Sequence, residues 1–92
     1  MKRIITALGN PTLNNELRRY EKYDVLAEDM LYQEATLDFL DKEEVDVIII
    51  SALLQGDKSP LEFAESIKEK CFSARVILIV ENISEEDKNI LV

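Results

Sequence analysis

The stretch EEVDVIIISALLQGD, residues 43–57, decides the fold. From Val45 to Ile50 the run is apolar apart from Asp46. A strand that is apolar on consecutive positions is buried on both faces, which is typical of a central strand in a parallel sheet. Ser51 follows directly, so this strand carries a small polar residue to the carboxyl end of the sheet, where α/β proteins place their sites.

Three further apolar segments predict strands at 2–8 (KRIITAL), 24–28 (DVLAE) and 75–80 (RVILIV). The segment 24–28 is less apolar than the others, which favours a place near an edge of the sheet. The segment 75–80 is apolar after Arg75, so we expect a second strand that is buried on both faces.

Helices are predicted between and after these strands. Asn10 followed by Pro11 indicates a helix start with Asn10 as N-cap, and Leu13, Leu17 and Tyr20 follow at helical spacing. A second helix is expected over 32–42, with its apolar side formed by Ala35, Thr36, Phe39 and Leu40.

A third helix starts at a capping box of Ser59 and Glu62, and its apolar stripe consists of Phe63, Ala64, Ile67 and Cys71. The acidic sequence at 84–87 predicts the start of a fourth helix, which would run to the chain end.

The alternation of strand and helix predicts an α/β fold with an open, doubly wound parallel sheet. We expect four β-α units in one domain, residues 1–92, with the flavodoxin/CheY-like strand order 2-1-3-4. The final residues, Ile90, Leu91 and Val92, are apolar and uncapped. This ending predicts a fragment of a longer chain, cut before a fifth unit, or a domain that a partner completes.

Charge and composition exclude several functions. Eleven basic against nineteen acidic residues give a net charge of −8, which opposes binding to nucleic acid or anionic membranes. No apolar run is long enough for membrane insertion. Cys71 is the only cysteine, which fits a reducing cytoplasm, and the absence of histidine removes the Ser-His-Asp triad and most transition-metal sites. We therefore expect no metal and no cofactor.

The fold predicts a crevice beyond the carboxyl ends of the strands, formed by Gly9, Asn10, Ser51 and Glu81. With DVIIIS where an apolar run ending in Asp is usual, the chain resembles the CheY-like receiver domain of two-component response regulators. That resemblance implies an acidic pair for Mg²⁺ after the first strand, a phospho-accepting Asp after the third, a Ser or Thr after the fourth and a Lys after the fifth.

Set against this pattern, the pocket is degenerate. No acid stands at Leu8, Gly9 or Asn10, Ser51 occupies the acceptor position, and Val80 or Glu81 falls at the hydroxyl position. The Lys position lies beyond Val92. Without converging carboxylates a hard cation has no cage, and without a cation phosphoryl transfer lacks charge neutralisation. The pattern predicts a pseudo-receiver that is not phosphorylated and is not an enzyme.

Residues 1–30, MKRIITALGNPTLNNELRRYEKYDVLAEDM, are similar to the N-terminal receiver-like domains of MinD/ParA-like ATPases of the pilus-assembly (Tad/CpaE) type. That resemblance implies a domain that dimerises or localises the ATPase that follows it.

The leading hypothesis is therefore a module that binds a protein partner or forms a homodimer. Its candidate interaction surface comprises Leu53, Leu54, Gln55, Gly56, Asp57, Ile90 and Leu91. The two adjacent leucines either tuck under the third helix or form an exposed patch. The alternatives are a small-molecule or nucleotide-binding domain that uses the crevice at Gly9, Asn10 and Ser51, and a phosphocarrier of a transferase system.

Overall fold

The computed structural model of the chain describes residues 1–80. The elements in chain order are β1 (Lys2–Ala7), α1 (Thr12–Leu17), β2 (Tyr23–Val25), α2 (Gln33–Leu40), β3 (Val47–Ser51), α3 (Pro60–Lys70) and β4 (Arg75–Ile79). The predicted fourth helix lies outside the described residues, as do the site residues Glu81, Ile90 and Leu91.

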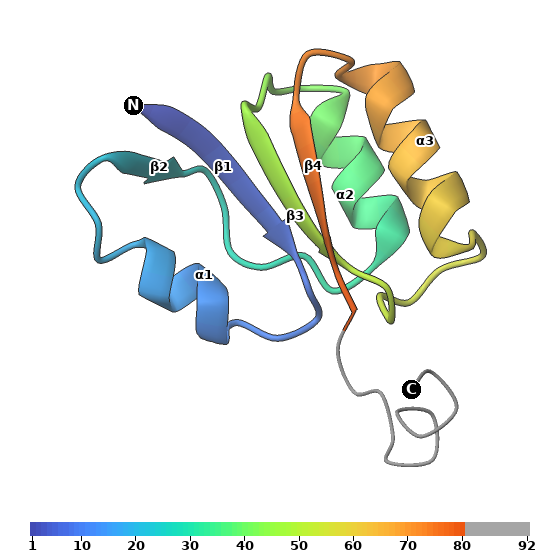
Figure 1. The fold of residues 1–92 in the computed structure, drawn as a ribbon, viewed down its shortest axis with the longest axis horizontal. Coiled ribbons are helices and arrows are strands. Elements are labelled where there is room, and N and C mark those ends of the chain that lie inside the picture. Colours follow the sequence, from blue (N-terminus) through green and yellow to red (C-terminus); the bar gives the residue numbers. More distant parts are fainter. Residues whose placement is uncertain (81–92) are drawn as a thin grey trace, which may run out of the picture.

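The four strands form one parallel sheet in the order β2-β1-β3-β4, which confirms the predicted fold class. Helices α2 and α3 lie side by side against one face of the sheet, and α1 covers part of the other (Figure 1). All strands point the same way, so their carboxyl ends share one edge of the molecule.

The core fills the space between the sheet and the pair α2 and α3. Ile5 on β1 and Ile48 and Ile50 on β3 are fully buried there against Phe63 and Ile67 of α3. Burial of one such side chain contributes about 1.5–3 kcal/mol, so this layer supplies most of the stability of the fold. The sequence predicted that β3 is buried on both faces, and this is confirmed, because consecutive residues of the strand, Ile48, Ile49 and Ile50, are all buried.

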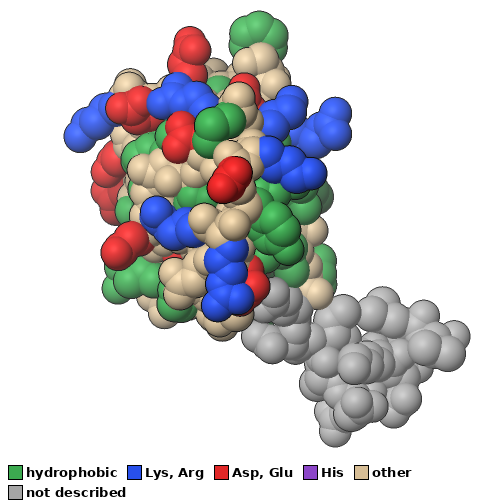
Figure 2. Space-filling view, turned by 90° about the vertical axis from the view of Figure 1, so that its left-hand side faces the viewer, with side chains coloured by type: hydrophobic (Ala, Val, Ile, Leu, Met, Phe, Trp, Pro, Cys, Tyr) green, Lys and Arg blue, Asp and Glu red, His purple; other side chains and the backbone are tan. Residues whose placement is uncertain are grey.

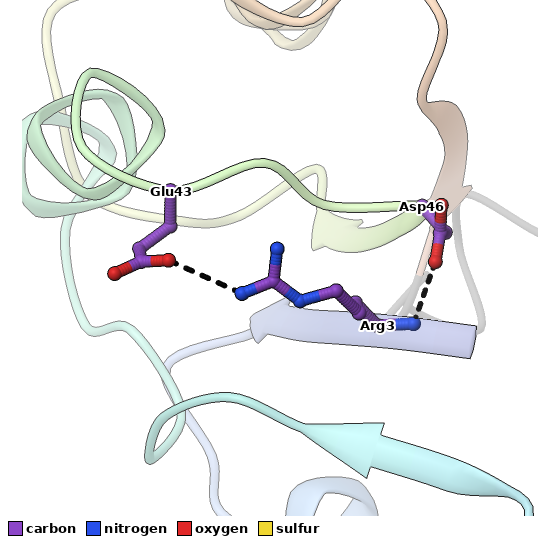
Figure 3. Close-up of polar contacts among 3 residues, drawn as sticks. All are labelled: Arg3, Glu43 and Asp46. Atoms are coloured by element: carbon purple, nitrogen blue, oxygen red, sulfur yellow. Dashed lines mark hydrogen bonds and ion pairs between the residues drawn. The ribbon is translucent and has the colours of Figure 1, made fainter. Parts of the chain in front are cut away.

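Ionic and polar contacts close the amino end of the sheet (Figure 3). The backbone N–H of Arg3 donates to Asp46 Oδ2 at 2.8 Å, and the guanidinium of Arg3 pairs with Glu43 at 3.1 Å. Asp46 also donates its own N–H to the carbonyl of Arg3 and accepts the N–H of Arg75. The side chain of Asp46 therefore ties β1 to the start of β3, while its backbone groups bond to both β1 and β4.

Strand β4 differs from its prediction. It was expected to be buried on both faces, but Ile77 is 41% exposed and Leu78 is 38% exposed. The reason is topological: among the described residues β4 pairs with β3 alone and forms an edge of the sheet.

The predicted β2 is too long. The strand ends at Val25, because the carbonyl of Ala27 turns to accept the side-chain amide of Asn14 and the chain at Met30 bonds back to Thr6 on β1.

Two helices also differ in detail. Helix α1 begins at Thr12 and ends at Leu17, so Tyr20 lies beyond it and is 54% exposed. The N-cap residue is Pro11 and not the predicted Asn10. Asn10 precedes the N-cap, and its Oδ1 accepts the N–H of Thr12. In α2 the covered side consists of Gln33, Thr36, Leu37, Phe39 and Leu40, so three of the four predicted residues are confirmed and the predicted Ala35 is exposed. The capping box and stripe predicted for α3 are confirmed.

None of the helices within residues 1–80 has the length and apolar character that crossing a membrane requires.

Candidate functional site

The candidate site lies where the loops after β1 and β3 meet at the carboxyl end of the sheet. Ala7 pairs with Ile50, and Gly9 lies next to Leu54, whose Cδ1 is 3.9 Å from the position that a Cβ on Gly9 would take. Gly9 has φ = 68°, the left-handed region that favours glycine, so its type is explained by the turn between β1 and α1.

Ser51 is buried at the end of β3, with 6% of its surface exposed. Its hydroxyl oxygen accepts the N–H of Leu53 at 3.1 Å, a local turn that side chains of this type commonly form. The hydroxyl thus stabilises the start of the β3–α3 loop.

Asp29 occupies this end of the sheet and was missed by the sequence analysis, which tested only the residues directly after β1. Its Oδ1 accepts the Thr6 hydroxyl at 2.6 Å and the N–H of Leu8 at 3.0 Å, and its Oδ2 accepts the N–H of Asn10 at 2.9 Å. Hydrogen bonds to a carboxylate are about twice as strong as neutral ones. The carboxylate therefore fixes the β1–α1 loop, Leu8 to Pro11.

The same network continues into α1. The amide of Asn14, which is 2% exposed, donates to Thr6 Oγ1 and to the carbonyl of Ala27, and its Oδ1 accepts the Arg18 Nε–H at 2.9 Å. Every polar group of Asn14 and Thr6 is thus engaged. The sequence signal for this residue was a polar side chain between the apolar positions Leu13 and Leu17.

Gln33 fixes the β3–α3 loop, Ala52 to Ser59, in a similar way. Its side-chain amide donates to the carbonyl of Lys58 and accepts the N–H of Lys58, and its backbone N–H donates to the carbonyl of Gln55. Gly56 lies against this side chain, because a Cβ on Gly56 would stand 2.6 Å from the Cβ of Gln33. The loop therefore requires glycine at this position for reasons of space.

The two adjacent leucines, Leu53 and Leu54, differ in burial. Leu54 is 7% exposed and belongs to the core cluster with Phe63, so it is not part of the surface to which we had assigned it. Leu53 is 59% exposed, and Leu31 and Tyr32 from the β2–α2 loop are each 53% exposed. We call Leu31, Tyr32 and Leu53 the carboxyl-end patch, since all three line a hollow of about 300 Å³ that also borders Gly9.

A second hollow of about 500 Å³ adjoins the first, with which it shares Tyr32 and Gln55. It is lined by the predicted loop residues Gln55, Gly56 and Asp57, together with Gln33 and Lys58. The structure thus places the described part of the predicted interaction surface at the same end of the sheet as Gly9 and Ser51.

Metal chemistry has little basis in this arrangement. Among the described residues no three His, Cys, Asp or Glu side chains come together in a way that could hold a metal ion. Asp29 is the acidic residue that lies beside the end of β1, and its carboxylate oxygens already accept three hydrogen bonds. A hard cation takes six or more oxygen ligands, and the Asp29 oxygens would have to share it with the N–H donors that they already accept.

Comparison with known proteins supports the fold. A solved structure described as a response regulator protein from Burkholderia pseudomallei, with a phosphorylated aspartic acid, calcium ion and citrate, superposes with a TM-score of 0.68 and 16% sequence identity. The match covers 95% of this chain and 51% of that chain, so this chain spans about half its length. No protein-family model and no curated protein matches the sequence. At this identity the likeness establishes the receiver fold alone.

Proposed function

We propose that this chain is a receiver-like regulatory domain that is not phosphorylated, catalyses no reaction and acts by binding another protein. The carrying observation is the state of the carboxyl end of the sheet. Ser51 replaces the acceptor carboxylate and gives its hydroxyl oxygen to Leu53, while Asp29 is engaged by three donors. The large apolar side chains that are exposed at this end are those of the carboxyl-end patch, Leu31, Tyr32 and Leu53.

The setting that we propose is the cytoplasm of a bacterium, within a regulatory or pilus-assembly protein. The resemblance of residues 1–30 to the receiver-like domains of MinD/ParA-like pilus-assembly ATPases supports it, and so does the lone Cys71, which matches a reducing compartment. In that setting the domain localises the protein that carries it.

Phosphorylation is tested by incubation with acetyl phosphate and Mg²⁺, followed by mass measurement of the intact protein. We expect no added phosphate for the wild type. We expect none for Ser51→Asp either, because this variant restores the acceptor without restoring a cage for the cation. One added phosphate on the wild type would contradict the proposal, and one on Ser51→Asp alone would show that the cation site is intact.

The binding role is tested with matched surface variants of the full-length protein in its native cell. Leu53→Glu puts a charge in the carboxyl-end patch, while Leu61→Glu does the same on α3, where Leu61 is 71% exposed. We expect Leu53→Glu to abolish localisation of the protein at unchanged abundance and Leu61→Glu to leave it intact. Equal localisation of both variants would exclude the patch as the binding surface.

A small ligand is the second candidate, favoured by the two adjoining hollows at Tyr32 and Gln55. Ligand pockets commonly measure about 300–1,000 Å³, and these two fall in that range. A saturable rise in melting temperature with ATP, GTP or a cyclic dinucleotide, lost in Tyr32→Ala, would favour this candidate over a protein partner.

A further inference from the structure

The larger of the two hollows at the carboxyl end of the sheet combines an aromatic side chain with two carboxylates. We call it the Tyr32 hollow; it measures about 500 Å³. Tyr32, Glu34 and Asp57 all line it, and all three residues are exposed. Neither Glu34 nor Asp57 forms an ion pair with another residue within residues 1–80. The hollow therefore presents two negative charges beside an aromatic ring.

The walls of the Tyr32 hollow are fixed by hydrogen bonds between the two segments that form them. The backbone N–H of Gln33 donates to the carbonyl of Gln55 at 2.8 Å, and Tyr32 and Gln55 form a parallel bridge. The side-chain amide of Gln33 bonds to both backbone groups of Lys58. The hollow is thus formed before any ligand binds, which lowers the cost of ordering on binding.

The Tyr32 hollow does not border the β4 edge of the sheet. Its lining residues belong to the β2–α2 loop, to α2 or to the β3–α3 loop, and none of the described ones belongs to β4. Its shape is therefore independent of what pairs with β4.

The charge around the Tyr32 hollow differs from that of the β2 side of the molecule. On the β2 side, which faces the viewer in Figure 2, Lys and Arg side chains lie among Asp and Glu side chains. The basic residue in the described lining of the hollow is Lys58. Its charge already acts on Glu62, whose pKa is lowered first by hydrogen bonds with Ser59 and also by Lys58. The lining of the hollow is thus net negative.

This lining discriminates between classes of ligand. The phosphates of a nucleotide would face the carboxylates of Glu34 and Asp57, and like charges repel. A wholly apolar segment would cover both carboxylates without pairing them, which costs free energy. A cationic group suits both features, because it pairs with carboxylates and is attracted to the face of an aromatic ring.

We propose that the Tyr32 hollow binds an arginine side chain of the protein partner, next to an apolar side chain of the same partner on the carboxyl-end patch. This inference rests on the proposed function, since Tyr32 belongs to both the patch and the hollow. A guanidinium stacks on an aromatic face and carries five donors for carboxylates, whereas a lysine ammonium acts as a point charge. Because alternate side chains of an extended segment share a face, we expect the apolar residue and the arginine two positions apart.

The test uses two short peptides as probes, acetyl-Leu-Gly-Arg-amide and the same peptide with citrulline in place of arginine. Citrulline has nearly the shape of arginine but no charge. In NMR titrations of the isotope-labelled 92-residue chain, we expect the amide signals of Tyr32, Gln55 and Gly56 to shift. The arginine peptide should bind about fivefold more tightly than the citrulline peptide. Equal binding of both peptides, binding of neither, or shifts confined to other residues would overturn the proposal.

Matched variants separate binding in the hollow from general attraction by the net charge of −8. Glu34→Gln combined with Asp57→Asn removes two charges from the hollow. Glu65→Gln combined with Glu69→Gln removes two charges from α3, where both residues line a different hollow. The preference for the arginine peptide should vanish in the first double variant and persist in the second. Equal loss in both would show an effect of net charge alone and contradict the proposal, as would a saturable shift of the same amide signals by ATP.

Localisation of the full-length protein distinguishes failure of this inference from failure of the proposed binding role. We expect the double variant at Glu34 and Asp57 to weaken localisation and the one at Glu65 and Glu69 to leave it intact. If Leu53→Glu abolishes localisation but the variant at Glu34 and Asp57 keeps it at the wild-type level, the binding role stands and the arginine assignment fails. Normal localisation of Leu53→Glu would contradict the binding role itself, while the peptide preference measured on the isolated chain would still establish the chemistry of the hollow.

Discussion

The loops after β1 and β3 occupy equivalent places at the carboxyl end of the sheet but are stabilised by different chemistry. The β1–α1 loop is held by a charge, since the carboxylate of Asp29 accepts the N–H groups of Leu8 and Asn10 in the loop and the hydroxyl of Thr6 on β1. The β3–α3 loop is held by a neutral amide, since Gln33 both donates to and accepts from Lys58. Asp29 lies in the segment between β2 and α2, and Gln33 is the first residue of α2.

This difference bears on function. In the receiver domains that this chain resembles, these two loops supply the groups that bind the cation and accept the phosphoryl group. Here the carboxylate is used for structure in one loop, and Ser51 gives its hydroxyl oxygen to the backbone in the other. Asp29, Gln33 and Ser51 thus hold the loops in place, and the surface that remains combines the exposed carboxyl-end patch with polar loop residues such as Gln55 and Asp57.

Removal of Asp29 should have the largest effect. Asp29→Ala leaves the Thr6 hydroxyl and the N–H groups of Leu8 and Asn10 without their acceptor, and we expect a loss of about 3 kcal/mol in the free energy of unfolding. Urea unfolding at neutral pH measures it. Glu28→Ala, next in sequence and exposed, is the control and should change stability by less than about 0.5 kcal/mol. Equal stability of the two variants would show that the carboxylate does not hold the loop.

The second largest loss of stability is expected in the β3–α3 loop, where Gly56 leaves no room for a side chain. In Gly56→Ala the new Cβ meets the Gln33 side chain, which must move and lose its two bonds to Lys58. We expect a loss of about 2 kcal/mol. The neighbouring Asp57→Ala, at an exposed position, serves as the control in the same unfolding experiment. A neutral Gly56→Ala would mean that Gln33 has room to rearrange without loss.

Local sequence signals predicted the parts of the fold that depend on local contacts. The apolar run of β3 and the capping box of Ser59 and Glu62 lie within single elements, and both are confirmed. Asp29 and Gln33 were missed because each acts on a loop about 20 residues away in sequence, and neither a polar residue in a loop nor one at the start of a helix has a distinguishing pattern. The exposure of β4 was missed because an apolar strand reads the same whether or not a neighbour covers it.

The turn of the β1–α1 loop can be separated from its polar contacts by changing Gly9. A Cβ at this position meets only Leu54, at 3.9 Å, so space is not limiting, and the cost of Gly9→Ala is the left-handed backbone at φ = 68°. We expect a loss of about 1.5 kcal/mol. Gly9→Asn should lose less, because asparagine tolerates this region better. Equal losses in the two variants would point to the side chain and not to the backbone as the cause.

The smallest effect is expected at the end of the β3–α3 loop, where the capping box starts α3. Ser59→Ala removes the acceptor of the Glu62 N–H and should lower the free energy of unfolding by about 1 kcal/mol.

The partner residue of this box, Glu62, makes stability depend on pH. The backbone N–H of Ser59, and then its hydroxyl, lower the pKa of Glu62 below its ordinary value of 4.5. A carboxyl whose pKa is lower in the folded state stabilises the fold above its unfolded pKa, and this contribution is lost as the pH falls through the lowered value. Glu62→Gln should therefore be less stable than the wild type at neutral pH and should approach it in acid. Urea unfolding at both pH values measures the difference, and a constant gap between the two proteins would show that the charge of Glu62 does not contribute.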